Sequence, residues 1–253
     1  MASTDDTDII SSTKFLWRWR DLIYILLGIV GILLFGVIVY GVILGFWGIN
    51  PEELMKPTVA QALGLAALET VALVGSIYLF ALRRRGYGWN AVGLRHTSTS
   101  WLVITGIVTL IAIPITSLIT LLVYFAIGQP LENPQLDFLL PEGISTIDAL
   151  LMLFLAGFAA PFGEELFFRG VLYTMLRERW GIFLGVVVSS LLFGLIHGNL
   201  AVGITGFLLG ILAAIVFEYS NSLWTAILVH SINNAAKIGL LYLMVKLGFS
   251  VGG

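Results

Sequence analysis

The amino-acid sequence predicts an all-α, polytopic transmembrane helical bundle with about seven or eight membrane spans. The composition is the first reason: 58% of the 253 residues are hydrophobic and only 11% are charged, whereas about a quarter of the residues of soluble domains are charged. The second reason is a series of long apolar stretches. A helix needs roughly 20 apolar residues to cross a hydrocarbon core of about 30 Å. The chain is therefore expected to be an integral membrane protein with the lipid bilayer as its surroundings.

Seven stretches satisfy this length requirement, two of them narrowly. They cover approximately residues 22–48, 59–82, 101–127, 147–176, 182–200, 203–219 and 222–247. Residues 1–20 are expected to form a cytoplasmic tail, and residues 21–253 a single transmembrane domain. The net charge of −2 gives no indication of a nucleic-acid partner, and the absence of cysteine excludes disulfides, thiolate catalysis and thiolate metal ligands.

Basic residues in the short loops predict the orientation. Lys and Arg are enriched on the cytoplasmic side of membrane proteins. They cluster before the first span, after the second and after the fourth: Lys14, Arg18, Arg20, Arg83, Arg84, Arg85, Arg95, Arg177 and Arg179. The N-terminus is therefore predicted to be cytoplasmic. No organelle signal stands out, so the expected location is the plasma membrane.

Several ionisable residues lie inside the predicted spans, where a charge at the helix centre costs about 2.5 to 3.5 kcal/mol. At this cost such residues are expected to pair, to titrate or to have a function. Glu69 and Lys237 are expected to pair across two helices, although either could line a cavity. The full set is Glu69, Glu164, Glu165, Arg169, His197, His230 and Lys237.

The stretch GEELFFRG, residues 163–170, brings two carboxylates and an arginine into one span. Glu165 and Arg169 are four residues apart, so they lie on the same face of a helix and are expected to form an ion pair. Glu164 points about 100° away from its neighbour. It is therefore left without a full counter-charge and can face a cavity, where it is a candidate general base.

Two further patterns lie on separate spans. FGLIH places Phe193 and His197 at i and i+4, and HSINN places His230 and Asn234 at the same spacing. Each pair therefore projects from one helical face. Counting along the helices at about 1.5 Å per residue brings these polar groups and Glu164 to overlapping depths in the membrane.

These three motifs resemble the signatures of the CAAX protease and bacteriocin-processing family of intramembrane endopeptidases, written EExxxR, FxxxH and HxxxN. They occur here in family order, and the resemblance covers about residues 147–247, the expected catalytic core. It implies that Glu164 and His197 activate a water for attack on a peptide carbonyl, while His230 and Asn234 stabilise the oxyanion. Glu165, Arg169 and Phe193 would support these four residues.

The resemblance further implies a metal-independent glutamic endopeptidase that has no cofactor. Its substrate would be a membrane-associated peptide or protein, of the CAAX or leader-peptide type. Zinc is the open alternative, because two histidines and a glutamate also form a plausible zinc set. Two rival functions are a transporter, which would also carry ionisable residues within the membrane, and a non-enzymatic bacteriocin-immunity or membrane binding protein.

Two pairs of glycines have the GxxxG spacing that permits close helix approach. Gly41 and Gly45 lie in the first predicted span, and Gly206 and Gly210 lie in the sixth. Both pairs are expected to serve helix packing.

Overall fold

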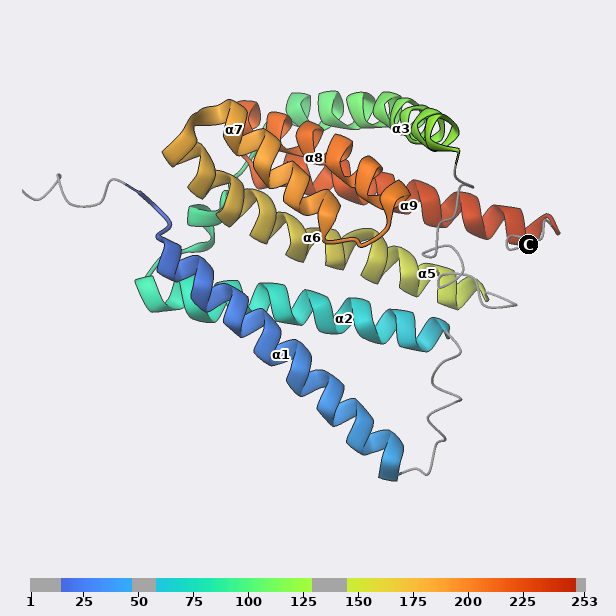
Figure 1. Ribbon diagram of the computed structural model, residues 1–253, viewed down its shortest axis with the longest axis horizontal. Helices are drawn as coiled ribbons and strands as arrows, with labels where there is room; N and C mark the ends of the chain where they lie inside the picture. Colours follow the sequence, from blue (N-terminus) through green and yellow to red (C-terminus); the bar gives the residue numbers. More distant parts are fainter. Residues whose placement is uncertain (1–14, 47–57, 129–144, 249–253) are drawn as a thin grey trace, which may run out of the picture.

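A computed structural model describes residues 15–46, 58–128 and 145–248, and these residues form helices and short connections without any strand (Figure 1). The all-α prediction is confirmed. In chain order the elements are α1 (Trp19–Phe46), α2 (Val59–Ser76), η2 (Ile77–Arg83), η3 (Trp89–Val92), α3 (Thr99–Ile127), α5 (Thr146–Phe154), η4 (Leu155–Ala159), α6 (Ala160–Glu165), η5 (Leu166–Tyr173), α7 (Thr174–Leu195), α8 (Leu200–Ser220) and α9 (Leu223–Lys246).

Six of the described helices are long and apolar enough to cross a membrane. The predicted count of seven or eight is compatible with this number, because the stretches 147–176 and 182–200 both lie in one 50-residue helix, Thr146–Leu195, which is counted once. This helix is sharply kinked at Gly181, whose φ of 83° is readily accessible only to glycine. A Cβ on Gly185 would lie 3.1 Å from the Arg177 backbone, so the chain folds back at this kink. Figure 1 shows α7 turning at this point and returning along the bundle.

Capping residues explain where several helices begin. Thr58 and Ser145 each form a capping box at the start of α2 and α5, and the side chains of Ser98 and Asn199 accept from backbone N–H groups at the starts of α3 and α8. Such caps satisfy the N–H groups that have no partner within a helix.

Three π-helical segments interrupt the regular helices: η2 continues α2, and η4 and η5 flank the six-residue α6. The GEELFFRG stretch therefore spans a boundary between α-helical and π-helical geometry. Such π-helical turns occur frequently at functional sites.

Helix α1 contacts the bundle mainly through its first half. Its buried residues are Asp21, Ile25 and Gly28, and Figure 1 shows α1 diverging from α2 toward its C-terminal end. A Cβ on Gly41 or Gly45 would have no neighbour within 4 Å among the described residues. The expectation that this glycine pair packs against another helix is therefore wrong for the described part of the chain.

The second glycine pair does serve packing, as expected. A Cβ on Gly206 would lie 3.5 Å from Gly194 Cα, and one on Gly210 would lie 3.0 Å from the Ser190 Cβ. Glycine at these positions allows α8 to approach α7 closely, and this contact fixes the wall of the cavity described below.

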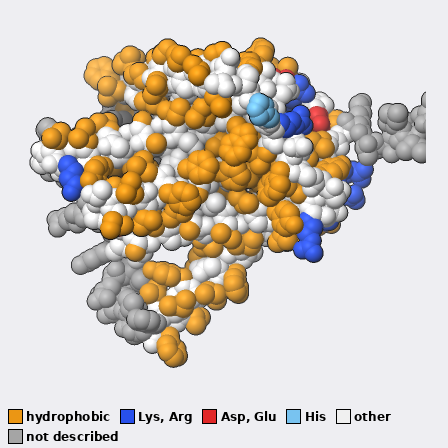
Figure 2. All heavy atoms as spheres, turned by 180° about the vertical axis from the view of Figure 1, so that it is seen from behind, with side chains coloured by type: hydrophobic (Ala, Val, Ile, Leu, Met, Phe, Trp, Pro, Cys, Tyr) orange, Lys and Arg blue, Asp and Glu red, His pale blue; other side chains and the backbone are white. Residues whose placement is uncertain are grey.

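Basic residues that are distant in the sequence meet at one end of the bundle. Buried Asp21 forms ion pairs with Arg84 and Arg85, and the Arg179 guanidinium donates to the Trp17 carbonyl. Figure 2 shows most of the visible Lys and Arg side chains at this end, while hydrophobic side chains cover most of the surface between the ends. Such a surface suits contact with lipid.

Residues 1–14 of the predicted tail lie outside the described residues. The part that follows them packs against the bundle: the Trp17 side chain is fully buried and its indole N–H donates to the Gly170 carbonyl over 3.0 Å. This bond ties the start of the described chain to the segment that carries the EExxxR pattern.

Candidate active site

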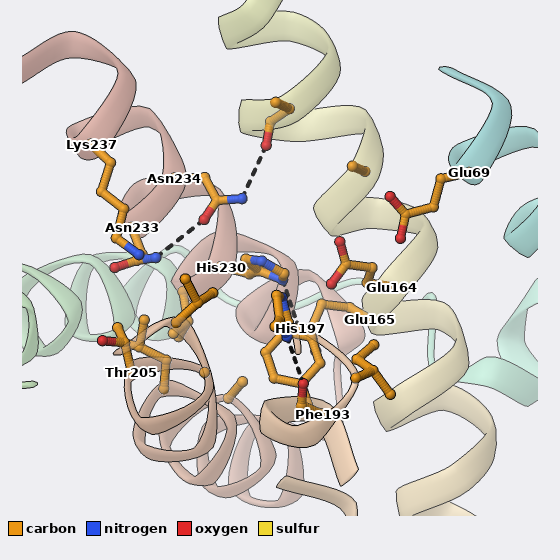
Figure 3. A pocket seen from close by; sticks show the side chains of 18 of the residues that line it. Glu69, Glu164, Glu165, Phe193, His197, Thr205, His230, Asn233, Asn234 and Lys237 are labelled. Atoms are coloured by element: carbon orange, nitrogen blue, oxygen red, sulfur yellow. Dashed lines mark hydrogen bonds and ion pairs between the residues drawn. The ribbon is translucent and has the colours of Figure 1, made fainter. Parts of the chain in front are cut away.

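A cavity of about 260 Å³ lies between α2, α6, α8, α9 and the end of α7. All four predicted catalytic residues and all three predicted supporting residues line it: Glu164, His197, His230, Asn234, Glu165, Arg169 and Phe193. Figure 3 shows the side chains of those other than Arg169, which converge from separate helices. The structure therefore brings every sequence-predicted site residue to one place.

Glu164 is the carboxylate without a counter-charge. Its side chain is only 8% exposed, and it makes no ion pair within the described ranges. Its Oε2 atom is buried and has no hydrogen-bond partner there. A buried carboxylate oxygen without a donor is costly, so a water or substrate group in the cavity is the natural partner of this atom.

Glu165 holds two other site residues at once. Its Oε1 atom lies 2.9 Å from Arg169 Nη1 and 3.0 Å from His230 Nδ1. The predicted Glu165–Arg169 ion pair is confirmed. Because the Glu165 carboxylate accepts a hydrogen bond from His230 Nδ1, this nitrogen carries a hydrogen. The Nε2 atom of His230 is then available to a group in the cavity.

The Arg169 guanidinium is fully buried and lies over the Phe193 ring, 4.7 Å from its centroid. The same ring contacts His197 and His230 in edge-on geometry, with centroid separations of 5.0 and 5.3 Å. Phe193 thus packs between the cation and both imidazoles, and fixes their relative positions.

His197 lies just beyond the last residue of α7, in the turn before α8. Its Nδ1 atom is 2.7 Å from the Phe193 carbonyl, one of the acceptors left free at a helix C-terminus. A carbonyl can only accept, so Nδ1 carries the hydrogen. The neutral ring therefore presents Nε2 as an acceptor.

Asn234 is positioned by two hydrogen bonds. Its Nδ2 donates to the Ala156 carbonyl over 3.0 Å, and its Oδ1 accepts from Asn233 Nδ2 over 3.1 Å. One hydrogen of the Nδ2 group remains for another acceptor. The amide therefore keeps a donor that a cavity ligand can use.

The expected ion pair between Glu69 and Lys237 is wrong. Within the described ranges, these two residues form no contact of 4.0 Å or less between charged atoms. Both instead line the cavity, and Figure 3 shows Glu69 on α2 beside Glu164, with Lys237 on α9 on the opposite side. The width of the cavity keeps the two charges apart, which helical spacing could not indicate.

Within the described ranges, no group of three or more His, Cys, Asp or Glu side chains is arranged to hold a metal ion. His197 and His230 each engage Nδ1 with a protein acceptor, and neither Nε2 atom has a hydrogen-bond partner among the described residues. A metal ion in the cavity would therefore have to be bound by the two Nε2 atoms and a carboxylate.

Asn233 and Glu69 line the cavity but were not among the site residues predicted from the sequence. Asn233 is buried, and its side chain donates to Asn234 and so orients it. It belongs to the same HSINN stretch from which Asn234 was predicted as a site residue. Glu69 belongs to α2, far from the three motifs in sequence. Its isolated charge in an apolar span indicated that it pairs or has a function. Only the packing of α2 against α6 places it near Glu164.

Part of the chain is similar in sequence to known proteins. Residues 146–236 match the family described as Rce1-like, type II CAAX prenyl endopeptidase. An uncharacterised 24.3 kDa protein of Escherichia coli is 32% identical over 125 residues, which cover 47% of this chain and 57% of that protein. A Bacillus subtilis protein, named "Putative membrane peptidase YdiL", is 27% identical over 111 residues, which cover 44% of this chain and 43% of that protein.

The matched part of the chain thus spans about half the length of these curated relatives. No solved structure matches the chain significantly. The family match includes all three motifs, from the paired glutamates through FGLIH to His230 and Asn234. Residues 146–236 are therefore similar to the Rce1-like CAAX endopeptidase family, and the resemblance to the CAAX protease and bacteriocin-processing family is confirmed over this segment.

Proposed function

We propose that this protein hydrolyses a peptide bond of a membrane-associated peptide or protein substrate, with Glu164 as general base and without a metal. One observation carries the proposal: the unpaired Glu164 carboxylate and the free Nε2 atoms of two histidines line the same cavity. The name of the matching family and the name of the Bacillus relative support a peptidase. By the same name, CAAX-type peptides anchored by a prenyl group are the first substrates to test.

The reaction begins with a water held between Glu164 and His197. The Glu164 carboxylate takes one proton of the water, while His197 Nε2 accepts a hydrogen bond from the other. The water oxygen then forms a bond to the carbonyl carbon of the substrate, and the carbonyl oxygen becomes an oxyanion. General base catalysis of this kind contributes about 100- to 10,000-fold to rates.

Two donors face the developing oxyanion. Asn234 offers its remaining Nδ2 hydrogen, and His230 donates from Nε2 when its ring is protonated. An adjacent carboxylate stabilises a protonated imidazole, and Glu165 is 3.0 Å from Nδ1. This refines the role of His230: a neutral ring bonded to Glu165 through Nδ1 would have no hydrogen on Nε2 to donate.

Collapse of the tetrahedral intermediate completes the reaction. The carbon–nitrogen bond breaks, and the leaving amine receives the proton that Glu164 took from the water. The products are an amine and a carboxylic acid, which loses its remaining proton to water to become a carboxylate, and Glu164 returns to its ionised form.

The test uses purified full-length protein and a panel of membrane-anchored fluorescent peptides, including S-prenylated ones. Glu164→Gln keeps the size of the side chain but removes the base, so we expect cleavage to fall at least about 100-fold. Glu218→Gln is the matched control, because Glu218 pairs with Arg177 away from the cavity. We expect it to retain activity.

The same cleavage assay, repeated in the presence of a metal chelator, distinguishes the glutamate mechanism from the zinc alternative. Wild-type cleavage is expected to persist in the chelator. Loss of cleavage that returns on adding zinc would contradict a metal-free mechanism. Full activity of Glu164→Gln would refute its role as base, and absence of cleavage across the panel would favour a binding or immunity function.

The proposed topology places the arginine-rich end of the bundle in the cytoplasm and the protein in the plasma membrane. It rests on the grouping of basic residues at one end and on the general preference of such residues for the cytoplasmic side.

A further inference from the structure

Trp17 contacts the active-site segment from outside the cavity. Its side chain is fully buried, although it lies before α1. A buried indole N–H needs an acceptor, and here it donates to the Gly170 carbonyl over 3.0 Å. The ring also meets Tyr87 edge-on, with a centroid separation of 6.0 Å. Because Gly170 belongs to η5, the π-helical segment that contains Arg169, the indole is bonded to the backbone that carries a site residue.

Charged side chains from two other parts of the bundle hold the backbone that carries this ring. The Leu16 N–H donates to Glu178 Oε2 over 2.9 Å, and the Leu16 carbonyl accepts from Arg85 Nη1 over 2.8 Å. The Trp17 carbonyl accepts from Arg179 Nη2 over 2.7 Å. Hydrogen bonds in which one group is ionised are about twice as strong as neutral ones. These three bonds therefore fix the place from which the indole reaches η5.

Gly170 is also in close contact with η3. A Cβ at this position would lie 2.8 Å from the Val92 carbonyl oxygen, so the approach requires glycine. The preceding carbonyl, that of Arg169, accepts from Thr174 Oγ1 over 2.9 Å. Two successive carbonyls of η5 thus accept hydrogen bonds from side chains. Because π-helical geometry is rare compared with α-helical geometry, contacts of this kind are expected to favour it here.

The geometry of η5 sets the position of Arg169. The guanidinium is fully buried, and within the described ranges its Nε and Nη2 atoms have no hydrogen-bond partner. Its position therefore depends on the bond from Nη1 to Glu165, on the Phe193 ring and on its own backbone. Glu165 in turn contacts His230 Nδ1 over 3.0 Å. A shift of η5 would thus reach the proposed oxyanion donor through two contacts.

We propose that Trp17 is a positioning residue for hydrolysis: its indole hydrogen bond holds η5 in the geometry in which Arg169 and His230 share the Glu165 carboxylate. This inference rests on the proposed peptidase function and adds to it a residue that does not contact the substrate. Trp17 is absent from the lining of the cavity. Loss of its hydrogen bond should therefore slow the chemical step and leave substrate binding unchanged.

The first test is Trp17→Phe, which keeps an aromatic ring in the buried position and removes the N–H donor. The assay uses purified full-length protein and the peptide that the wild type cleaves fastest. We expect kcat to fall about fivefold, as the loss of one hydrogen bond allows, and KM to stay within about twofold. Rates are normalised to the folded fraction, which thermal unfolding of the same sample in detergent measures.

Trp180→Phe is the matched control. Trp180 is next to Arg179 in the sequence, but its side chain is 47% exposed and it is absent from the lining of the cavity. The variant should keep the wild-type kcat.

A double-mutant cycle separates positioning from general stabilisation. If Trp17 acts through Arg169, its replacement should matter little once Arg169→Lys has disturbed the contact with Glu165. We expect Trp17→Phe to lower kcat about fivefold in the wild type and less than about twofold in Arg169→Lys, because residues that act through one network are not additive. A contribution to overall folding alone would give the same factor in both backgrounds.

Hydrogen exchange measures η5 directly and needs no substrate. In Trp17→Phe the backbone amides of residues 166–173 should exchange at least about fivefold faster than in the wild type, while those of α8 keep the wild-type rate. Trp180→Phe should change neither. This measurement decides the proposal if no peptide is cleaved or if Arg169→Lys is inactive. If Trp17→Phe does not fold, Arg179→Lys, which weakens the bond to the Trp17 carbonyl, replaces it and should show the same faster exchange in η5.

Three results would overturn the proposal. They are a Trp17→Phe enzyme with wild-type kcat or with a change in KM alone, an equal loss of kcat in the wild-type and Arg169→Lys backgrounds, and an unchanged exchange rate in η5. Each of them leaves the peptidase function intact, because cleavage by the wild type and its loss in Glu164→Gln test that function separately.

Discussion

At the scale of single residues, the site depends on how one buried carboxylate is shared. Glu165 contacts both Arg169 and His230 through its Oε1 atom, whereas Glu164 beside it forms no ion pair with a described residue. Adjacent glutamates on one helical turn thus have different surroundings. The first residue is available for chemistry, and the second fixes the arginine and the histidine.

Glu165→Gln is expected to destabilise the protein strongly. Both side chains of the Glu165–Arg169 pair are at most 1% exposed, so removing the carboxylate leaves a buried positive charge without compensation. Breaking a buried ion pair in this way costs about 3 to 5 kcal/mol. Thermal unfolding in detergent would measure this loss as a lower midpoint.

The Arg177–Glu218 ion pair, which is partly exposed, provides the control for the unfolding measurement on Glu165→Gln. The Arg177 side chain is 44% exposed, and a partly exposed pair contributes about 0 to 1 kcal/mol. Glu218→Gln should therefore shift the unfolding midpoint much less. Equal shifts in the two variants would show that burial does not govern the contribution of the Glu165 pair.

At the scale of helices, glycines decide how closely the elements around the site approach. Gly210 on α8 faces both Ser190 on α7 and the guanidinium of Arg169. The π-helical segments η4 and η5 on either side of α6 add to this arrangement, because they alter the angular spacing of the side chains that the EELFFR stretch presents.

Gly210→Ala is expected to damage both stability and activity. The new Cβ would lie 2.9 Å from Arg169 Nη2 and 3.0 Å from Ser190 Cβ. Overpacking of this kind costs about 1 to 3 kcal/mol, and movement of Arg169 would disturb the Glu165–His230 contact. Peptide cleavage and thermal unfolding measure the two effects.

Gly41→Ala provides the matched control on α1. A Cβ there meets no described atom within 4 Å, and alanine is favoured over glycine in a helix by about 1 kcal/mol. Activity should therefore be unchanged and stability equal or slightly higher. A Gly210→Ala variant that behaved like this control would contradict the close packing of α8 against Arg169.

At the scale of the whole molecule, the bundle has one arginine-rich end. Asp21, Arg84, Arg85 and Arg179 meet there through contacts between the start of the described chain, η2 and α7. Helix α9 begins next to this end, since Leu223 N donates to the Gly93 carbonyl, and it runs to the opposite end at Lys246.

Single cysteines can test this orientation without background, because the sequence contains none. His96→Cys lies in the exposed loop before α3 at the arginine-rich end, and Lys246→Cys lies at the other end. In intact cells a membrane-impermeant maleimide should label only Lys246→Cys, and His96→Cys should react after permeabilisation. The reverse pattern would invert the proposed topology, and labelling of both denatured variants controls for reactivity.

The motifs predicted much of this site because helical periodicity relates sequence spacing to direction. Glu165 with Arg169, and Phe193 with His197, were predicted as neighbours on one face, and they are in contact. Gly181 was not recognised as the kink between two predicted spans, because glycine is common in apolar helices. The Glu69–Lys237 prediction failed because pairing across helices depends on the distance between them.

The sequence by itself determined the all-α membrane class, the approximate spans and seven of the residues that line the cavity, because hydropathy and the 3.6-residue repeat are local properties of the chain. Only the tertiary structure decided that Glu165 contacts His230, that Asn233 orients Asn234, and that Glu69 and Lys237 lie on opposite sides of the cavity. These relations depend on how the helices pack and where glycine permits close approach, and a single helix carries no information about either.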